Sequence, residues 1–487
     1  MFLERILART RCDLEERRRL LPLERLRELA AAQPPARDFA AALRPQAGEP
    51  GLRLIAEIKR ASPSKGPLAP DLDPVALART YEAAGAAAIS VLTEPHFFLG
   101  APEHLTAVKK AVSLPVLRKD FIVDEYQVYE ARAWGADALL LICAALTPQE
   151  LMRLLRLTRD LGMEALVEVH SAAETEMALA AGARVIGVNS RDLVTFNMNP
   201  FLIRELRRLI PADRILVAES GIHSEGDARR LRRYDVHAML VGESLVKAGD
   251  VQAQIKRLLW GANGGIQVKI CGLRSAEALR TAIESGADLL GLMFYPRSKR
   301  YLEPSQARRL LAEAGYLALA EQGQVVPDLV GVFVNEEISR INEIAEELDL
   351  HFVQLHGEES PELCASLRHP VLKAVPVYGS ATQEEARRYR AVAWRVLLDT
   401  PTAGYGGSGR THDWEVARTI AAEQPIILAG GLTPANVAEA IATVRPWGVD
   451  VSSGVESNGE KDAHKIRAFI EAVRQSSEQF PAAETVG

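Results

Sequence analysis

The chain has few cysteines and lacks long apolar runs and an excess of positive charge. Its four cysteines are widely spaced in 487 residues, without CxxC or Cys/His ligand spacing, so neither a disulfide framework nor a zinc site is expected. The formal net charge of −6 provides no basic surface for nucleic acid. No apolar run approaches the ~20 residues needed to cross a bilayer, and the amphipathic start has no signal-peptide core. We therefore expect a cytoplasmic protein without metal, membrane or nucleic-acid partners.

The length and composition are those of a two-domain globular protein. A hydrophobic fraction of 48% and a charged fraction of 25% are typical of folded proteins, and 487 residues suit two domains of roughly 250 residues each. The stretch LWGANGGI, residues 259–266, interrupts a helix-patterned segment with three glycines and an asparagine. We predict a first domain over 1–258, a linker over 259–266 and a second domain over 267–487.

Short apolar segments alternate with capped helical segments in both halves. Asp73-Pro74 and Thr147-Pro148-Gln149-Glu150 have the pattern of helix N-termini, and glycines such as Gly85 and Gly135 follow helices directly before apolar runs. The first half contains eight such runs, centred on Ile55, Ile89, Val116, Leu140, Leu166, Ile186, Val217 and Leu240. The second half also contains eight, centred on Val268, Leu290, Val332, Val353, Ala374, Leu397, Ile427 and Val449.

This alternation predicts an α/β fold of two tandem (β/α)8 TIM barrels, the first with an N-terminal helical extension. The runs are nearly continuous in aliphatic residues, as expected for strands that are buried on both faces of a parallel sheet. The alternative is an open doubly wound sheet. Barrels of this kind have their active sites at the carboxyl ends of the strands, so polar residues at those positions are candidates for function.

Charged residues end several strands of the first half. Glu57 and Lys59 follow strand one, Lys119 ends strand three, and Glu168 ends strand five. A single lysine at a strand end is usually a solvated charge, but these four and Asn189 are predicted to lie around one barrel mouth. Charged groups that lie close together shift one another's pKa values, and such shifts suit them to acid–base catalysis.

In the second half, Cys271 and Asp399 end strands one and six. These positions face each other across a barrel mouth. A thiolate can accept a proton and a carboxylic acid can donate one, so the pair suits an isomerisation that moves hydrogen. Cysteines are more often core residues, as Cys143 in its apolar run illustrates.

Glycines end the last two strands of each half, where backbone N–H groups can hold a phosphate. The pairs are Gly221 with Gly242, and Gly430-Gly431 with Ser453-Gly454. For any one glycine, a tight strand-to-helix turn is the favoured explanation, but the recurrence in both halves favours phosphorylated ligands.

The stretch GYGGSG, residues 404–409, matches the dinucleotide pattern GxGxxG. It is followed by polar residues where a dinucleotide fold would begin an apolar helix, and it occurs late in its domain. We interpret it as an active-site loop after strand six. A dinucleotide-dependent oxidoreductase remains the second hypothesis, and a phosphosugar-binding protein without catalysis is the third.

Motifs in family order cover nearly the whole chain. IAEIKRASPSKG, LPVLRKDFI, ALVEVH, IGVNSRDL and AESGI in the first half resemble indole-3-glycerol phosphate synthase. VKICGLR, FYPRSKRYL, GVFVN, VQLHGEE, LLDT, GGSG, AGGL and VDVSSG in the second half resemble phosphoribosylanthranilate isomerase. The resemblance implies a fused enzyme of tryptophan biosynthesis in which the isomerase product is the synthase substrate.

For the synthase half, the resemblance implies that Lys119 is the general acid and Glu168 the base for dehydration. Glu57 and Lys59 would assist them, and Arg191 would lie near the anthranilate carboxylate. The remaining residues implied to contact the substrate are Asn189, Ser220, Gly221, Gly242 and Glu243, the last three through phosphate-facing N–H groups.

For the isomerase half, the resemblance implies that Asp399 protonates the ribose ring oxygen and Cys271 removes the C2′ proton. Arg300 and His356 would flank this site, and Gly431, Ser453 and Gly454 would bind phosphate. Neither reaction needs a cofactor. The expected partners are small phosphorylated substrates. The oligomeric state is left open, and the sequence is compatible with a monomer.

Overall fold

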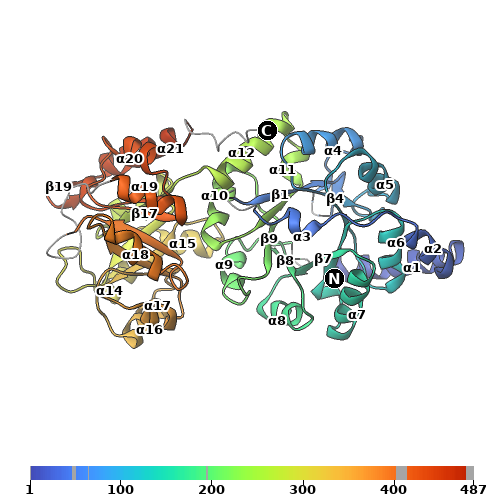
Figure 1. The fold of residues 1–487 in the computed structure, drawn as a ribbon, viewed down its shortest axis with the longest axis horizontal. Coiled ribbons are helices and arrows are strands. Elements are labelled where there is room, and N and C mark those ends of the chain that lie inside the picture. The colour runs from blue at the N-terminus through green and yellow to red at the C-terminus, as the bar shows by residue number, and fades with distance from the viewer. Residues whose placement is uncertain (1, 46–50, 64, 193–195, 402–413, 479–487) are drawn as a thin grey trace. The chain divides into compact units, whose positions relative to one another are not determined.

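Two closed barrels of eight parallel strands organise the chain (Figure 1). The computed structural model describes residues 2–45, 51–63, 65–192, 196–401 and 414–478. The chain divides into two units, Met1–Asn263 and Gly264–Gly487. The predicted pair of TIM barrels is confirmed, and the open doubly wound sheet is excluded.

The strands of the first barrel each contain the residue on which a predicted strand was centred. They are β1 Arg53–Ile58, β4 Ala88–Leu92, β5 Val116–Lys119, β6 Ala138–Ile142, β7 Glu164–Val169, β8 Val185–Asn189, β9 Ile215–Glu219 and β10 Ala238–Val241. β1 pairs with β10 in parallel, Arg53 opposite Ala238, which closes the ring. A short hairpin, β2 Ala61–Ser62 with β3 Gly66–Pro67, follows β1.

Helices surround this ring and extend it at the N-terminus. The extension consists of α1 Phe2–Leu20, α2 Leu23–Ala31 and α3 Phe39–Ala42. The others are α4 Pro74–Ala83, α5 Pro102–Ala111, α6 Glu125–Ala133, α7 Pro148–Asp160, α8 Ala172–Ala180, α9 Leu202–Arg207, α10 Glu225–Leu231, α11 Glu243–Val246 and α12 Val251–Asn263, with 3₁₀ turns at Cys143–Ala145 and Arg232–Tyr234.

The helix ends follow the local sequence signals. Asp73 accepts hydrogen bonds from the first-turn N–H groups of α4, and Thr147 forms a capping box with Glu150 at the start of α7. Gly85 and Gly135 have φ of 96° and 89° after their helices, a conformation that disfavours residues with a Cβ atom.

The apolar core of the first unit has two layers. An inner cluster contains strand side chains such as Ile55, Leu117, Leu166 and Val217 together with residues of the N-terminal helices, and a larger cluster lies between strands and helices. Leu3 and Ile6 of α1 belong to the inner cluster. The N-terminal helix is therefore packed against the barrel interior.

The second barrel repeats the plan. Its strands are β11 Gln267–Cys271, β12 Leu289–Met293, β13 Asp328–Phe333, β14 Phe352–Leu355, β15 Val371–Pro376, β16 Arg395–Asp399, β17 Ile426–Leu428 and β18 Gly448–Val451. Its helices are α13 Ala276–Glu284, α14 Pro304–Glu313, α15 Tyr316–Glu321, α16 Ile338–Glu347, α17 Pro361–Ser366, α18 Ala381–Arg388, α19 Trp414–Glu423, α20 Val437–Val444 and α21 Ala463–Glu478. A 3₁₀ turn at Ser453–Val455 and a hairpin of β19 Glu456–Ser457 with β20 Glu460–Lys461 follow β18.

The stretch expected as a linker is partly helical. α12 continues to Asn263 and passes through Gly261 without a break. A Cβ atom on Gly261 would lie 2.2 Å from the backbone oxygen of Glu225, so this glycine permits close packing between α12 and α10. The prediction that Gly261 breaks the helix is wrong, because a contact distant in sequence determines its role.

The described part of the chain lacks two features. None of its helices is long and apolar enough to span a membrane. It also contains no group of three or more His, Cys, Asp or Glu side chains arranged to hold a metal ion.

Candidate active sites

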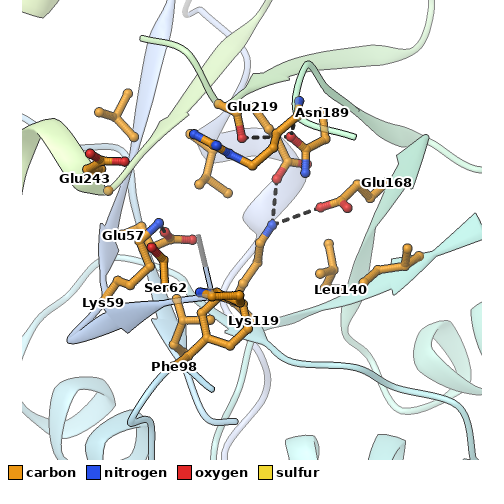
Figure 2. Close-up of a pocket in the computed structure, with 18 of the residues that line it drawn as sticks. Glu57, Lys59, Ser62, Phe98, Lys119, Leu140, Glu168, Asn189, Glu219 and Glu243 are labelled. Carbon is orange, nitrogen blue, oxygen red and sulfur yellow. Dashed lines mark hydrogen bonds and ion pairs between the residues drawn. The ribbon is translucent and has the colours of Figure 1, made fainter. Parts of the chain in front are cut away.

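A cavity at the carboxyl ends of the first barrel's strands is lined by all ten candidate residues of that half (Figure 2). β1, β5, β7, β8, β9 and β10, or the loops that follow them, carry these residues. They are Glu57, Lys59, Lys119, Glu168, Asn189, Arg191, Ser220, Gly221, Gly242 and Glu243.

Lys119 lies between two carboxylates. Its Nζ is 3.1 Å from Oε2 of Glu168 and 2.6 Å from Oε2 of Glu219, and both contacts are visible in Figure 2. Burial by itself lowers the pKa of Lys119, but Glu219, Glu168 and Glu57 outweigh burial and raise it. The ammonium group is therefore charged at neutral pH, the state that a proton donor requires.

The carboxylates of Glu168 and Glu219 both contact Lys119 but differ in the other charged group beside them. Burial raises the pKa of Glu168, but Lys119 and His170 reverse this effect and hold that pKa well below its usual range. Burial raises the pKa of Glu219, and Lys119 opposes this increase only in part, since Glu168 adds to it. Divergent pKa values in neighbouring groups separate acid and base roles, and the carboxylate of Glu168 is the one available as a base.

The sequence analysis placed Glu219 within the motif AESGI but did not identify it as a site residue. Gly187 on β8 makes room for it, because a Cβ atom there would lie 2.1 Å from Oε1 of Glu219. The signal was available in the alternation along β9, where Val217 points into the barrel core and Glu219, two residues later, lies on the same face.

Asn189 connects two other candidate residues. Its Oδ1 accepts a hydrogen bond of 2.7 Å from Oγ of Ser220 and another of 3.1 Å from the backbone N–H of Arg191. Ser220 has a φ of 67°, a left-handed conformation that is rare for serine. At β1, Glu57 and Lys59 form an ion pair of 2.8 Å.

The loops after β9 and β10 carry the glycines that were expected to bind phosphate. Gly221 has a φ of 73°, and a Cβ atom on Gly242 would lie 2.5 Å from Oε1 of Glu57. Oε1 of Glu243 is 2.6 Å from Nζ of Lys65 and 2.9 Å from Nζ of Lys247. Two lysines therefore lie beside the end of β10, both paired with the carboxylate of Glu243.

The cavity also has an apolar wall that sequence reasoning did not assign to the site. Phe2, Leu3 and Ile6 of α1 line it, together with Phe98 and Phe196. Phe2 makes an edge contact with the ring of Phe196, with centroids 5.1 Å apart. The apolar face of the N-terminal helix was recognised in the sequence, but its position over the mouth depends on tertiary packing.

In the second barrel, Cys271 ends β11 and is buried. Arg300 lies beside it, since the Cδ atom of Arg300 is 2.3 Å from the position of a Cβ atom on Gly272. The guanidinium of Arg300 forms a bidentate ion pair with Glu456, at 2.7 and 2.9 Å, and this bond raises the pKa of Arg300.

Asp399 and His356 form a second group. Nε2 of His356 is 3.2 Å from Oδ2 of Asp399, and Nδ1 of His356 is 2.9 Å from Nε2 of Gln354. Both residues line a cavity beside the ends of β14, β15 and β16. Residues 404–409, with the GxGxxG pattern, lie outside the described residues.

The glycine loops link these two groups around the rim. A Cβ atom on Gly430 would lie 3.0 Å from Oδ1 of Asp399, and one on Gly454 would lie 1.8 Å from the backbone oxygen of Leu432. Gly430 and Gly431 have φ of 83° and 65°. Ser453 begins the 3₁₀ turn that contains Gly454, and Oγ of the preceding residue, Ser452, donates to the backbone oxygen of Cys271.

Comparison with known proteins divides the chain into two regions, and the boundary between them coincides with the boundary between the two structural units. Residues 3–258 match the family model for indole-3-glycerol phosphate synthase, and residues 268–472 match the model for N-(5'phosphoribosyl)anthranilate isomerase. Indole-3-glycerol phosphate synthase 2 of Streptomyces coelicolor is 57% identical over 50% of this chain and 93% of its own length.

Two further relatives extend the comparison. The multifunctional tryptophan biosynthesis protein of Schizosaccharomyces pombe is 41% identical over 87% of this chain, which spans 59% of that protein's length. A solved phosphoribosyl anthranilate isomerase from Thermotoga maritima is 44% identical, covers 43% of this chain and 99% of its own, and has a TM-score of 0.39.

Proposed function

Because the chain belongs to the indole-3-glycerol phosphate synthase family over residues 3–258 and to the phosphoribosylanthranilate isomerase family over residues 268–472, we propose that it catalyses two consecutive steps of tryptophan biosynthesis. The second barrel converts N-(5-phosphoribosyl)anthranilate to 1-(2-carboxyphenylamino)-1-deoxyribulose 5-phosphate. The first barrel then closes the indole ring, with loss of carbon dioxide and water, to give indole-3-glycerol phosphate.

In the isomerase step, Asp399 donates a proton to the ribose ring oxygen as the ring opens to an iminium. Cys271, as a thiolate, removes the C2′ proton, and the resulting enolamine tautomerises to the ketone. His356, 3.2 Å from Asp399, orients that carboxyl group. Arg300 and the N–H groups of Gly431, Ser453 and Gly454 hold the anionic parts of the substrate.

In the synthase step, Lys119 protonates the ketone oxygen as the anthranilate ring carbon attacks the carbonyl carbon. Carbon dioxide leaves from the same ring carbon, and Glu168 accepts the proton whose removal drives the loss of water. Arg191 pairs with the anthranilate carboxylate, and Glu57 with Lys59 supports Lys119. Asn189 and Ser220 bind the substrate's polar groups, and the N–H groups of Gly221, Gly242 and Glu243 bind the phosphate.

The partners in this proposal are small phosphorylated molecules, and neither step requires a cofactor. We also propose a cytoplasmic location, because Cys271 must remain a free thiol and cysteines persist in that form in a reducing compartment. All four cysteines are free.

The position of Lys119 between Glu168 and Glu219, inside the cavity lined by ten candidate residues, carries the proposal most strongly. The test is to supply phosphoribosylanthranilate to the full chain and follow products over time by chromatography. The ketone should form first and indole-3-glycerol phosphate second. Unchanged substrate would contradict the proposed isomerase, and ketone that never declines would contradict the proposed synthase.

A further inference from the structure

The mouth of the second barrel contains a buried ion pair directly below Cys271. Lys269 and Cys271 alternate along β11 and share its inward face. Nζ of Lys269 is 3.0 Å from Oδ1 of Asp450 on the neighbouring strand β18. Lys269 is fully buried and Asp450 is 7% exposed, so this pair is shielded from solvent and interacts strongly with nearby charge.

Gly291 on β12 allows the sulfur and the ammonium to meet. A Cβ atom on Gly291 would lie 2.9 Å from Sγ of Cys271 and 3.1 Å from Nζ of Lys269. Both atoms therefore border the space that a larger residue would fill. A glycine inside a strand often marks such a close approach.

The charges around the thiol offset part of the effect of its burial. Three cations act on it, Lys269, Lys461 of β20 and Arg300. Two carboxylates accompany them: Asp450 pairs with Lys269, and Glu456 pairs with Arg300 and Lys461. One positive charge is left in excess, and a thiolate on Cys271 would balance it.

We propose that Lys269, held by Asp450, is a positioning residue that stabilises the thiolate of Cys271 so that the sulfur can act as the isomerase base. The inference rests on the proposed isomerase function, whose reaction requires an anion at this sulfur. Burial raises the pKa of Cys271 and outweighs the neighbouring charges, of which Lys269 lowers this pKa and Asp450 raises it by less. Without the ammonium, the thiol would deprotonate only at higher pH.

The first test measures the thiol directly and needs no turnover. The rate of iodoacetamide alkylation of Cys271 is followed from pH 6 to 11 by peptide mass spectrometry, with exposed Cys12 as an internal reference. The double variant Lys269→Met with Asp450→Asn removes both members of the pair and leaves no unpaired charge. Because Lys269 lowers the pKa of the thiol more than Asp450 raises it, the alkylation curve of this variant should shift upward by about one pH unit, a tenfold slower reaction at neutral pH.

The control removes a different buried ion pair from the same barrel. Lys373 and Glu359 lie 2.9 Å apart and are both buried, so Lys373→Met with Glu359→Gln reproduces the loss of a buried pair without changing the neighbours of Cys271. Its alkylation curve should match the wild type. An unshifted curve in the Lys269/Asp450 variant, or an equal shift in the control, would overturn the proposal.

The second test measures catalysis. In the Lys269/Asp450 variant, the acidic limb of the isomerase kcat/KM profile should move upward in parallel with the alkylation curve. If the double variant does not fold, Gly291→Ala separates the sulfur from the ammonium while keeping every charge, and it should shift both profiles in the same direction. An inactive wild-type isomerase would refute the proposed function, whereas the alkylation result would still decide the role of Lys269.

Discussion

The two barrels share a topology but organise their acid–base groups differently. In the first, Lys119 contacts Glu168 and Glu219 directly at one point of the mouth, where both carboxylates are buried and the lysine side chain is 12% exposed. In the second, Asp399 contacts His356, whereas Cys271 lies with Lys269 and Arg300, so the proposed acid and base belong to separate groups. The same barrel topology can therefore place its charged groups in one cluster of directly contacting side chains or in two separate groups.

Both barrels use a strand glycine to make room for these groups. Gly187 on β8 leaves space for the carboxylate of Glu219, and Gly291 on β12 leaves space for Cys271 and Lys269. In both barrels, a glycine without a side chain therefore leaves the space that a charged or nucleophilic side chain occupies at the mouth.

The strongest test of the comparison is a reciprocal loss of activity. Cys271→Ala and Asp399→Ala should each reduce isomerisation by about 10²–10⁴-fold, since each removes a proton-transfer group, while indole formation from the ketone intermediate is unchanged. Lys119→Ala should do the reverse. The two reactions are assayed separately with their own substrates, and loss of both reactions in a folded single variant would refute two independent sites.

Replacing Glu219 with glutamine tests whether this carboxylate acts on Lys119 in the first barrel. The change removes one negative charge that raises the pKa of Lys119, so the basic limb of the synthase pH profile should move to lower pH. We expect kcat to fall about tenfold, the equivalent of about 1.4 kcal/mol. Synthase rates measured from pH 6 to 10 check this, and an unchanged basic limb would show that Glu219 does not act on Lys119.

Gly187→Ala should affect only the first barrel. A methyl group there would displace the Glu219 carboxylate, so synthase activity should fall by up to about tenfold through the same loss of interaction. The isomerase should be unaffected, and Gly249→Ala, whose added methyl meets no atom within 4 Å, provides the control. Full synthase activity in Gly187→Ala would mean that the synthase does not depend on the space that Gly187 leaves for Glu219.

His170 should make the stability of the first barrel depend on pH. Burial lowers its pKa, but Glu168 and Glu174 outweigh this and raise it from 6.5 to about 10. The contribution is therefore fully present below the unfolded pKa near 6.5 and is lost as pH rises toward 10.

His170→Gln should consequently lower thermal stability more at pH 6 than at pH 10, by an amount of the order of a few kcal/mol at pH 6. The measurement is the midpoint for heat loss of synthase activity, each variant normalised to its own unheated rate. Equal destabilisation at both pH values would contradict a charged His170 in the folded protein.

The last prediction concerns the helix that ends the first unit. Gly261→Ala would place a methyl group 2.2 Å from the backbone oxygen of Glu225, and overpacking of this kind costs about 1–3 kcal/mol. Calorimetry should show a lower transition temperature than in the Gly249→Ala control. Increased stability, as expected for an unconstrained helical alanine, would contradict the close contact between α10 and α12.

The fold followed from local signals, because buried parallel strands and helix caps leave local patterns. Each of the sixteen runs of apolar residues became a strand, and Asp73 and Thr147 cap the helices they were expected to cap. The role of Gly261 was predicted wrongly from its neighbours in the sequence, because the contact that explains this glycine comes from Glu225. Propensity does not report tertiary contacts.

Candidate residues at strand ends were recognisable because a barrel gathers those ends at one rim. Lys269 and Asp450 were not, since they lie one step below the rim and their pairing joins the first and last strands of the barrel. Glu219 was not recognised either, because only its 2.6 Å contact with Lys119 distinguishes it from a structural carboxylate.

The central claim is that each barrel carries its own complete active site. The most direct test is to mix equal amounts of the Cys271→Ala and Lys119→Ala chains and supply phosphoribosylanthranilate. The account predicts that the mixture forms indole-3-glycerol phosphate, while each variant alone, and a chain carrying both substitutions, does not. A mixture as inactive as the doubly substituted chain would contradict it.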